Sequence, residues 1–128
     1  MNLLGRMNST TSRGAAGEAL AAAFLESRGL AIIARNLRCR GGELDLVCRD
    51  GALLIVVEVR QRSGLRFGGA LASVTAAKQR KIIRATRFFL QRHAQYRDVR
   101  LRFDVLGVQA APGRTPALEW IKDAFRAT

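Results

Sequence analysis

The chain has 128 residues and a mass of 14.0 kDa, the size of one compact domain with a hydrophobic core. Its hydrophobic fraction of 48% and mean hydropathy of +0.01 exclude a disordered basic tail. No apolar run approaches the ~18 residues of a membrane-spanning helix. The net charge of +12, from 22 basic and 10 acidic residues, predicts a polyanionic partner, with nucleic acid first and an anionic membrane second.

The scarce residue types narrow the chemistry. His93 is the only histidine, and Cys39 and Cys48 are the only cysteines. These three residues cannot supply the four ligands of a closed zinc site. The Leu3–Leu4 pair is too short for the apolar part of a secretory signal, so we expect a cytoplasmic protein with two free thiols. Any enzymatic chemistry would then depend on carboxylates and on a hard cation such as Mg²⁺, bound through oxygen atoms.

Hydrophobic periodicity divides the chain into elements. In chain order we expect a helix over 13–28, strands over 30–36, 43–49 and 52–60, a helix from Ser73 or Thr75 to His93, a strand over 99–108, a short strand over 118–121 and a short helix over 122–125. Residues 1–12 lack periodicity and are expected to form a flexible arm before a single domain, 13–128. A three-stranded meander followed by a helical crossover predicts an α/β fold, a mixed sheet of order α-β-β-β-α-β-β with flanking helices.

The spacing of apolar residues also predicts which side chains face the core. In the first helix, Leu20 and Phe24 are expected to form the buried stripe. Strict alternation in the second strand places Leu44 and Leu46 on one face and Asp45 on the other. The third strand is almost continuously β-branched or Leu, which is typical of a central strand buried on both faces.

Glu58 interrupts this most apolar strand, where a carboxylate is costly unless it is paired, hydrogen-bonded or bound to a metal. Asp50–Gly51 predicts a two-residue hairpin turn. In that register Glu43 faces Glu58 directly, and Asp45 is its diagonal neighbour, roughly 7–8 Å away at Cα. Carboxylate oxygens at this separation can converge on one divalent cation.

Arg60 lies two residues after Glu58 and therefore on the same face. A plain ion pair between the two explains them without any function, and Asp45 taken alone has an equally simple explanation as a surface acid. Three acids on one face of a +12 chain favour metal-dependent phosphodiester chemistry, in which the cation polarises the phosphate and neutralises the leaving oxygen.

Six segments, in this order, resemble the YraN family of small bacterial proteins, predicted endonucleases related to archaeal Holliday-junction resolvases. They are G-A-A-G-E (14–18), R-N-L-R-C-R-G-G-E-L-D-L-V (35–47), V-V-E-V-R-Q-R (56–62), F-G-G-A-L-A-S-V-T-A-A-K (67–78), R-F-D-V (102–105) and E-W-I-K-D-A-F (119–125). The resemblance covers nearly the whole chain, from about residue 13 to residue 125.

The resemblance implies the restriction-endonuclease-like fold and its PD-(D/E)xK site, in which acids surround Mg²⁺ or Mn²⁺. The matching positions here are Glu18, Asp45 and Glu58 as metal ligands, Arg60 at the motif lysine, Glu43 as a supporting acid, and Gln61 and Lys78 as auxiliary groups near the scissile phosphate. Leu44 stands where the motif has proline. Because a guanidinium keeps its proton at any usable pH, Arg60 can orient water or stabilise charge but cannot be a general base.

Further arginines are candidates for holding a phosphate backbone. They are Arg62 and Arg66 at a Gly-rich loop, and Arg80 and Arg84 on the second long helix. An ordinary connecting loop and a solvated helix face explain them equally well. His93 is expected to be a helix cap or a surface residue.

Two functions therefore follow from the sequence. The first is a Mg²⁺- or Mn²⁺-dependent DNA endonuclease, with branched or junction DNA among its candidate substrates. The alternative is a non-catalytic module that binds nucleic acid, DNA or RNA, on a nuclease scaffold. We do not expect a membrane partner, because the basic helix would have to leave the core to bind lipid. We expect no small-molecule cofactor. A homodimer remains open.

Overall fold

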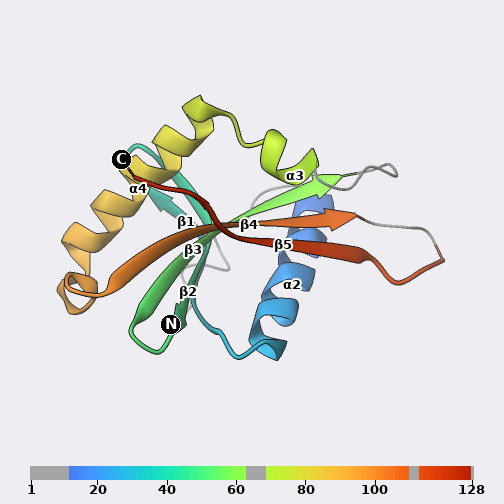
Figure 1. Cartoon of the computed structure of the whole chain (residues 1–128), viewed down its shortest axis with the longest axis horizontal. Coiled ribbons are helices and arrows are strands. Elements are labelled where there is room, and N and C mark those ends of the chain that lie inside the picture. Colours follow the sequence, from blue (N-terminus) through green and yellow to red (C-terminus); the bar gives the residue numbers. More distant parts are fainter. Residues whose placement is uncertain (1–11, 63–68, 110–112, 128) are drawn as a thin grey trace.

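The protein is described by a computed structural model over residues 12–62, 69–109 and 113–127. Its elements are α2 (Ser12–Ser27), β1 (Ala31–Cys39), β2 (Gly42–Asp50), β3 (Leu53–Arg62), α3 (Gly69–Ala72), α4 (Ala76–Arg92), the 3₁₀ turn η1 (Ala94–Tyr96), β4 (Arg100–Gln109) and β5 (Ala117–Phe125). The five strands form one mixed sheet in the order β1-β2-β3-β4-β5 (Figure 1). Only β3 and β4 pair in parallel, across the crossover that contains α3 and α4. The predicted α/β class is thereby confirmed, and no helix in the described ranges is long and apolar enough to cross a membrane.

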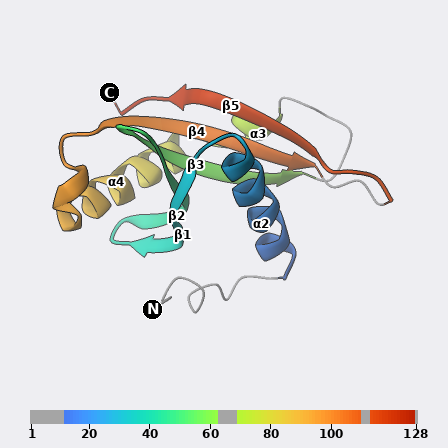
Figure 2. The same cartoon turned by 90° about the horizontal axis from the view of Figure 1, so that it is seen from below.

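The sheet separates two hydrophobic clusters. Helix α2 covers one face, and α3 and α4 cover the other (Figures 1 and 2). Strand β3 supplies both clusters, because Ile55 and Val57 pack under α2 whereas Leu54 and Val56 pack under α4. It is the buried central strand that its sequence predicts, and it carries the candidate acid Glu58.

The buried side of α2 differs from the expected one. Ala21, Ala22 and Leu25 are fully buried, whereas Leu20 is 40% exposed. The helix is apolar on nearly every side, so its spacing alone does not select a face. Gly17 lies against the sheet so closely that a Cβ atom there would collide with the side chain of Gln61.

The β2–β3 hairpin is present, but its register differs from the predicted one. Asp50 pairs with Leu53, so Gly51 and Ala52 occupy the turn, with Gly51 at a φ of 60°. The predicted pairing of Glu43 with Glu58 is therefore wrong by two residues. A two-residue shift leaves every side chain on its original face, so the candidate acids stay on one side.

The predicted alternation in β2 fails at its beginning. Leu46 packs under α2 as expected, but Leu44 joins Val47 in the cluster under α4. The register places Asn36 opposite Asp45, and Asn36 is buried with a φ of 49°, outside the extended region. The β1–β2 pair thus departs from a regular pleat next to Asp45.

The second long helix begins and ends where its sequence predicts. Thr75 is the N-cap, and its hydroxyl accepts a hydrogen bond from the Lys78 amide at 3.2 Å. His93 is the C-cap, and its Nδ1 lies 2.8 Å from the Phe89 carbonyl oxygen. The buried face of α4 includes Ile82 and Phe89.

The end of the chain is one strand, not the predicted short strand and helix. Strand β5 continues to Phe125, and the break in its apolar pattern is a bulge at Asp123, which has a φ of 54°. The bulge follows from the fully buried carboxylate of Asp104, which accepts a hydrogen bond from the Asp123 amide at 2.9 Å. The same carboxylate accepts hydrogen bonds from the Trp120 indole N–H at 2.9 Å and from two nitrogens of Arg102, each at 2.8 Å. The hydrophobic periodicity of residues 118–125 carries no information about Asp104, because Asp104 lies on the neighbouring strand.

We expect Asp104→Ala to lower the free energy of unfolding by about 3 kcal/mol, because it leaves the Arg102 guanidinium and the Trp120 N–H without their acceptor. Urea denaturation monitored by Trp120 fluorescence measures the change. Asp98→Ala is the control, since it removes the same charge from an exposed position. Equal effects of the two substitutions would contradict the role given to Asp104.

Candidate active site

Two carboxyl groups meet on the α4 face of the sheet, where β2 and β3 begin to separate. The backbone ladder ends at the pair Leu46–Val57, and the same register continued by one residue places Asp45 directly across from Glu58. Beyond the ladder, Asp45 Oδ2 accepts the Val59 N–H at 2.9 Å. Asp45 and Glu58 also share a hydrogen bond between their side chains. The predicted diagonal neighbours are therefore in direct contact.

Two cations flank Glu58. Arg60 Nη1 lies 3.3 Å and Lys78 Nζ lies 3.7 Å from Glu58 Oε2, and the Glu58 side chain is only 4% exposed. Arg60 is also held by Ser73, whose hydroxyl accepts a bond from Arg60 Nε at 2.9 Å and whose carbonyl accepts one from Nη2 at 3.3 Å. The predicted approach of Lys78 from its helix to the acids is present in the structure.

The pair binds a proton unusually well. Burial, followed by the charge of Asp45, raises the pKa of Glu58 to about 8, although Lys78 and Arg60 act in the opposite direction. Burial also raises the pKa of Asp45, against the effect of the Val59 N–H and of the hydrogen bond with Glu58. At neutral pH without a metal, we therefore expect the two carboxyl groups to share a proton as a pair.

Glu18 approaches the pair from α2. Burial raises its pKa, and the charges of Asp45 and Glu43 raise it further, whereas a hydrogen bond with Asn36 lowers it. Its Oε1 atom is buried without a hydrogen-bond partner in the described structure. A buried, unpaired carboxylate oxygen next to other acids is a position where a cation would be stabilised.

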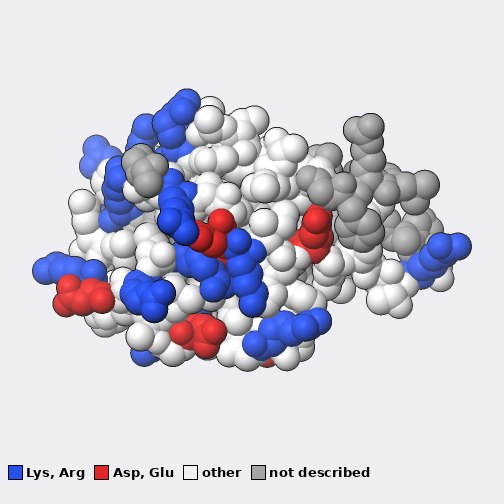
Figure 3. Space-filling view, in the orientation of Figure 1, with Lys and Arg blue, Asp and Glu red and all other residues white. Residues whose placement is uncertain are grey.

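The other predicted residues are more dispersed. Gln61 turns to the opposite face from Arg60 and packs against Gly17 of α2. Arg80 and Arg84 are exposed on α4, and Arg84 covers Gly41 at the β1–β2 turn. The side chain of Arg62 and the whole of Arg66 lie outside the described residues. Figure 3 shows basic side chains gathered over the α4 half of that view.

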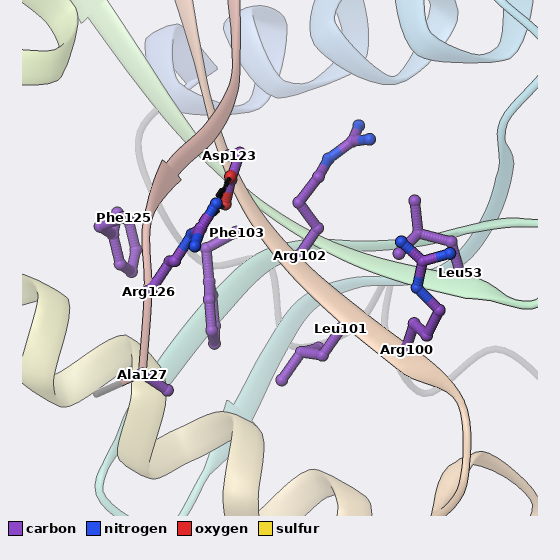
Figure 4. A pocket seen from close by; sticks show the side chains of 9 residues that line it. All are labelled: Leu53, Arg100, Leu101, Arg102, Phe103, Asp123, Phe125, Arg126 and Ala127. Atoms are coloured by element: carbon purple, nitrogen blue, oxygen red, sulfur yellow. Dashed lines mark hydrogen bonds and ion pairs between the residues drawn. The ribbon is translucent and has the colours of Figure 1, made fainter.

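The larger of the two cavities described here, about 480 Å³, does not coincide with the acids. It lies between the start of β3, the start of β4 and the end of β5, and Leu53, Arg100, Phe103 and Arg126 are among its lining residues (Figure 4). Glu58 is in the C-terminal half of β3 instead. The candidate site is therefore an acidic pair on the sheet and not the Figure 4 cavity.

Comparison with known proteins adds the family. Residues 17–108 match the sequence model of "Uncharacterised protein family UPF0102". The chain belongs to this family. The family includes the YraN proteins, so the family membership expected from the six segments is confirmed. The match contains Glu18, Asp45, Glu58 and Lys78.

Individual UPF0102 proteins are similar along most of their length. A UPF0102 protein of Xanthomonas campestris pv. campestris is 52% identical over 114 residues, which cover 89% of this chain and 91% of the relative. Those of Ralstonia pickettii and Stutzerimonas stutzeri are 51% and 45% identical and cover 91% and 93% of this chain, and 91% and 98% of their own lengths.

The side chains of this UPF0102 protein suit a divalent cation that keeps part of its hydration shell. In the three described ranges, no three His, Cys, Asp or Glu residues are grouped closely enough to form a complete metal site. Mg²⁺ is commonly held by one or two carboxylates, with water or substrate phosphate completing its ligands. Asp45 and Glu58 provide such a pair, and the proton that they share marks a place for positive charge.

Sequence reasoning missed three groups that shape the UPF0102 site. They are Ser73, which fixes Arg60, the Val59 amide, which binds Asp45, and Asn36, which bonds to Glu18. All three fall inside the family segments, but their roles depend on contacts between elements. Their sequence positions alone carry no signal of these roles.

Without divalent cations, the stability of the protein should fall as the pH rises from about 5 to about 8. The folded state holds the Glu58 proton more tightly than the unfolded chain does, whose ordinary glutamate pKa is 4.5, so this contribution is complete at low pH and is lost as the pH passes through about 8. Glu58→Gln keeps a neutral side chain. We therefore expect the wild-type protein to lose about 1–3 kcal/mol relative to it over this range.

Urea denaturation at several pH values in the presence of a chelator measures this difference. Glu26→Gln, at an exposed position of α2, is the matched control and should follow the wild-type pH profile. Parallel profiles for the wild-type protein and Glu58→Gln would show that Glu58 is ionised in the folded protein throughout.

Proposed function

We propose that this protein is a Mg²⁺- or Mn²⁺-dependent nuclease of the PD-(D/E)xK type, with a restriction-endonuclease-like fold, that hydrolyses phosphodiester bonds in DNA. The observation that carries the proposal is the contact between the carboxyl groups of Asp45 and Glu58, on the face where Lys78 and Arg60 converge. The net charge of +12 supports a nucleic-acid substrate, since a basic surface attracts the phosphate backbone.

Each residue has a distinct proposed role. Asp45 and Glu58 hold the cation, and Glu18 faces it from α2 with a buried, unpaired oxygen. The bound cation would supply Lewis-acid stabilisation of the scissile phosphate and of the leaving oxygen. Glu43 keeps the neighbourhood acidic, through its charge interaction with Glu18. Gln61 packs against α2 and contributes to the position of that helix.

In this proposal, two residues together replace the motif lysine: Arg60 provides a fixed charge and Lys78 provides a mobile ammonium group. Arg60 donates two hydrogen bonds to Ser73, which fix its guanidinium group beside Glu58. The Lys78 ammonium makes only a 3.7 Å ion pair with Glu58, and its side chain is 37% exposed. Lys78 is therefore the cation free to turn toward a bound phosphate, and an ammonium group, unlike a guanidinium, can also give up a proton.

Asp45→Asn and Glu58→Gln should each lower the rate of DNA cleavage in Mn²⁺ by at least about 100-fold, because each removes a ligand of the cation. Single-turnover assays on linear, branched and single-stranded DNA measure the rate and identify the preferred structure. Glu26→Gln should cut at the wild-type rate. Purified wild-type protein that cuts none of these substrates would contradict the proposal, as would variants that cut as well as the wild type.

Lys78→Ala should lower the cleavage rate at saturating DNA by about 100-fold, because it removes the mobile ammonium from the phosphate. Lys81→Ala, one turn along α4 at an exposed position, should weaken DNA binding only slightly and leave the saturated rate unchanged. Equal rates for the two variants at saturating DNA would show that Lys78 acts only through general charge.

One observation favours the second function, a non-catalytic module for nucleic acid. Glu58 already has Arg60 and Lys78 as partners, and both must yield before a cation can approach its Oε2. Calorimetric titration with Mn²⁺ separates the two functions. Binding that disappears in Asp45→Asn supports the nuclease, whereas salt-dependent DNA binding without any Mn²⁺ binding supports the module.

A further inference from the structure

A second cavity lies between the end of β1 and the C-terminal half of α4. Its volume is about 270 Å³, and its lining includes Arg38 and Arg40 from the β1 side, Arg92 from α4, and the aromatic ring of Phe88. Lys78 stands in the first turn of α4 and Arg92 is its last residue, so at 1.5 Å per residue the cavity is roughly 20 Å along the helix from the acidic pair. It is a separate location.

Among the described residues, the lining of this cavity is basic and aromatic, with no acid in it. The ion pairs of the described chain include none of Arg38, Arg40 and Arg92. The Figure 4 cavity differs, because Arg102 is bound to Asp104 there and Arg126 to Asp123. Arg40 and Arg92 both line the cavity, and an anion between them would relieve the repulsion of their charges.

A purely structural explanation covers only part of the cluster. Arg92 is in the last turn of α4, where a cation favours the helix dipole, and His93 caps the same end. Arg38 lies directly across from Glu43 in the β1–β2 ladder, so a cross-strand charge pair explains it. Arg40, in the turn after β1, has no such explanation. The Arg40 guanidinium lies 5.7 Å from the Phe88 ring centre, which positions it at the cavity wall.

We propose that the cavity between β1 and α4 binds the phosphate group of a nucleotide. Guanidinium groups match phosphate oxygens in bidentate geometry, and a phosphate carries enough charge to serve more than one of them. The Phe88 ring and the His93 ring, which stacks on Phe89 at 4.2 Å, provide flat surfaces beside that phosphate. The nucleotide is either free or part of a nucleic-acid strand, and the site does not depend on the Asp45–Glu58 pair.

Binding assays in a chelating buffer test the site apart from any cleavage. The probes are inorganic phosphate, a nucleoside 5′-monophosphate, and a short single-stranded oligonucleotide. The variant is Arg40→Gln/Arg92→Gln, and the matched control is Arg87→Gln/Arg97→Gln, which removes the same charge from exposed positions outside the cavity. We expect the cavity variant, and not the control, to lose affinity about 10-fold or more.

Loss for the monophosphate identifies a free nucleotide as ligand, and loss for the oligonucleotide alone identifies a phosphate within a strand. Equal losses in the two variants would overturn the proposal, because the effect would then be one of net charge. Wild-type protein that binds neither the monophosphate nor the oligonucleotide would overturn it too.

Cys39 provides a measurement that needs no substitution. Its half-buried thiol lines the cavity, whereas Cys48 is fully buried under α2 and burial raises its pKa to about 12. A bound nucleotide should slow alkylation of Cys39, read by mass spectrometry, in proportion to occupancy. Unchanged alkylation at saturating ligand would place the ligand elsewhere and overturn the assignment. Asp45→Asn should be protected like the wild type, which keeps this result separate from the nuclease hypothesis.

Discussion

The contact between Asp45 and Glu58 is the constraint on which the site depends. Two carboxyl groups buried side by side cannot both be charged unless a cation replaces the proton that they share. The neighbouring groups stabilise negative charge on the pair: the Val59 amide donates a hydrogen bond to Asp45, and Arg60 and Lys78 form ion pairs with Glu58. The pair is costly to fold, and that cost makes binding of a proton or a cation favourable there.

The sheet makes this contact possible. Strands β2 and β3 stop pairing through their backbones at the point where the two acids begin, so side chains take over the hydrogen bonds. Helices on opposite faces then bring Glu18 and Lys78 to the same end of these strands. The opposite face of the sheet carries another buried acid, Asp104, which pairs with Val57 on the neighbouring strand and whose hydrogen bonds are satisfied within the protein. Asp104 stabilises the fold, whereas Glu58 faces a second carboxyl group, whose charge disfavours its own.

The basic residues have different surroundings. Arg102 and Arg126 are bound to acids and serve the structure. Arg60 is shared between Glu58 and Ser73. Arg40 and Arg92 form no ion pair among the described residues. The arginines that contribute to the net charge of +12 therefore have different roles. Those without an acidic partner are the ones available to an anionic ligand.

Local patterns in the sequence determined the element order, the central strand β3, the limits of α4 and the common face of Asp45 and Glu58, because hydrophobic periodicity and capping act over a few residues. Tertiary structure alone decided the register of the β2–β3 hairpin, the buried side of α2 and the bulge in β5. Each of these depends on partners far away in the chain. The local sequence allows the β2–β3 turn at two positions and does not select the buried side of α2. It also does not show that Asp104 binds the amide of a residue on the neighbouring strand.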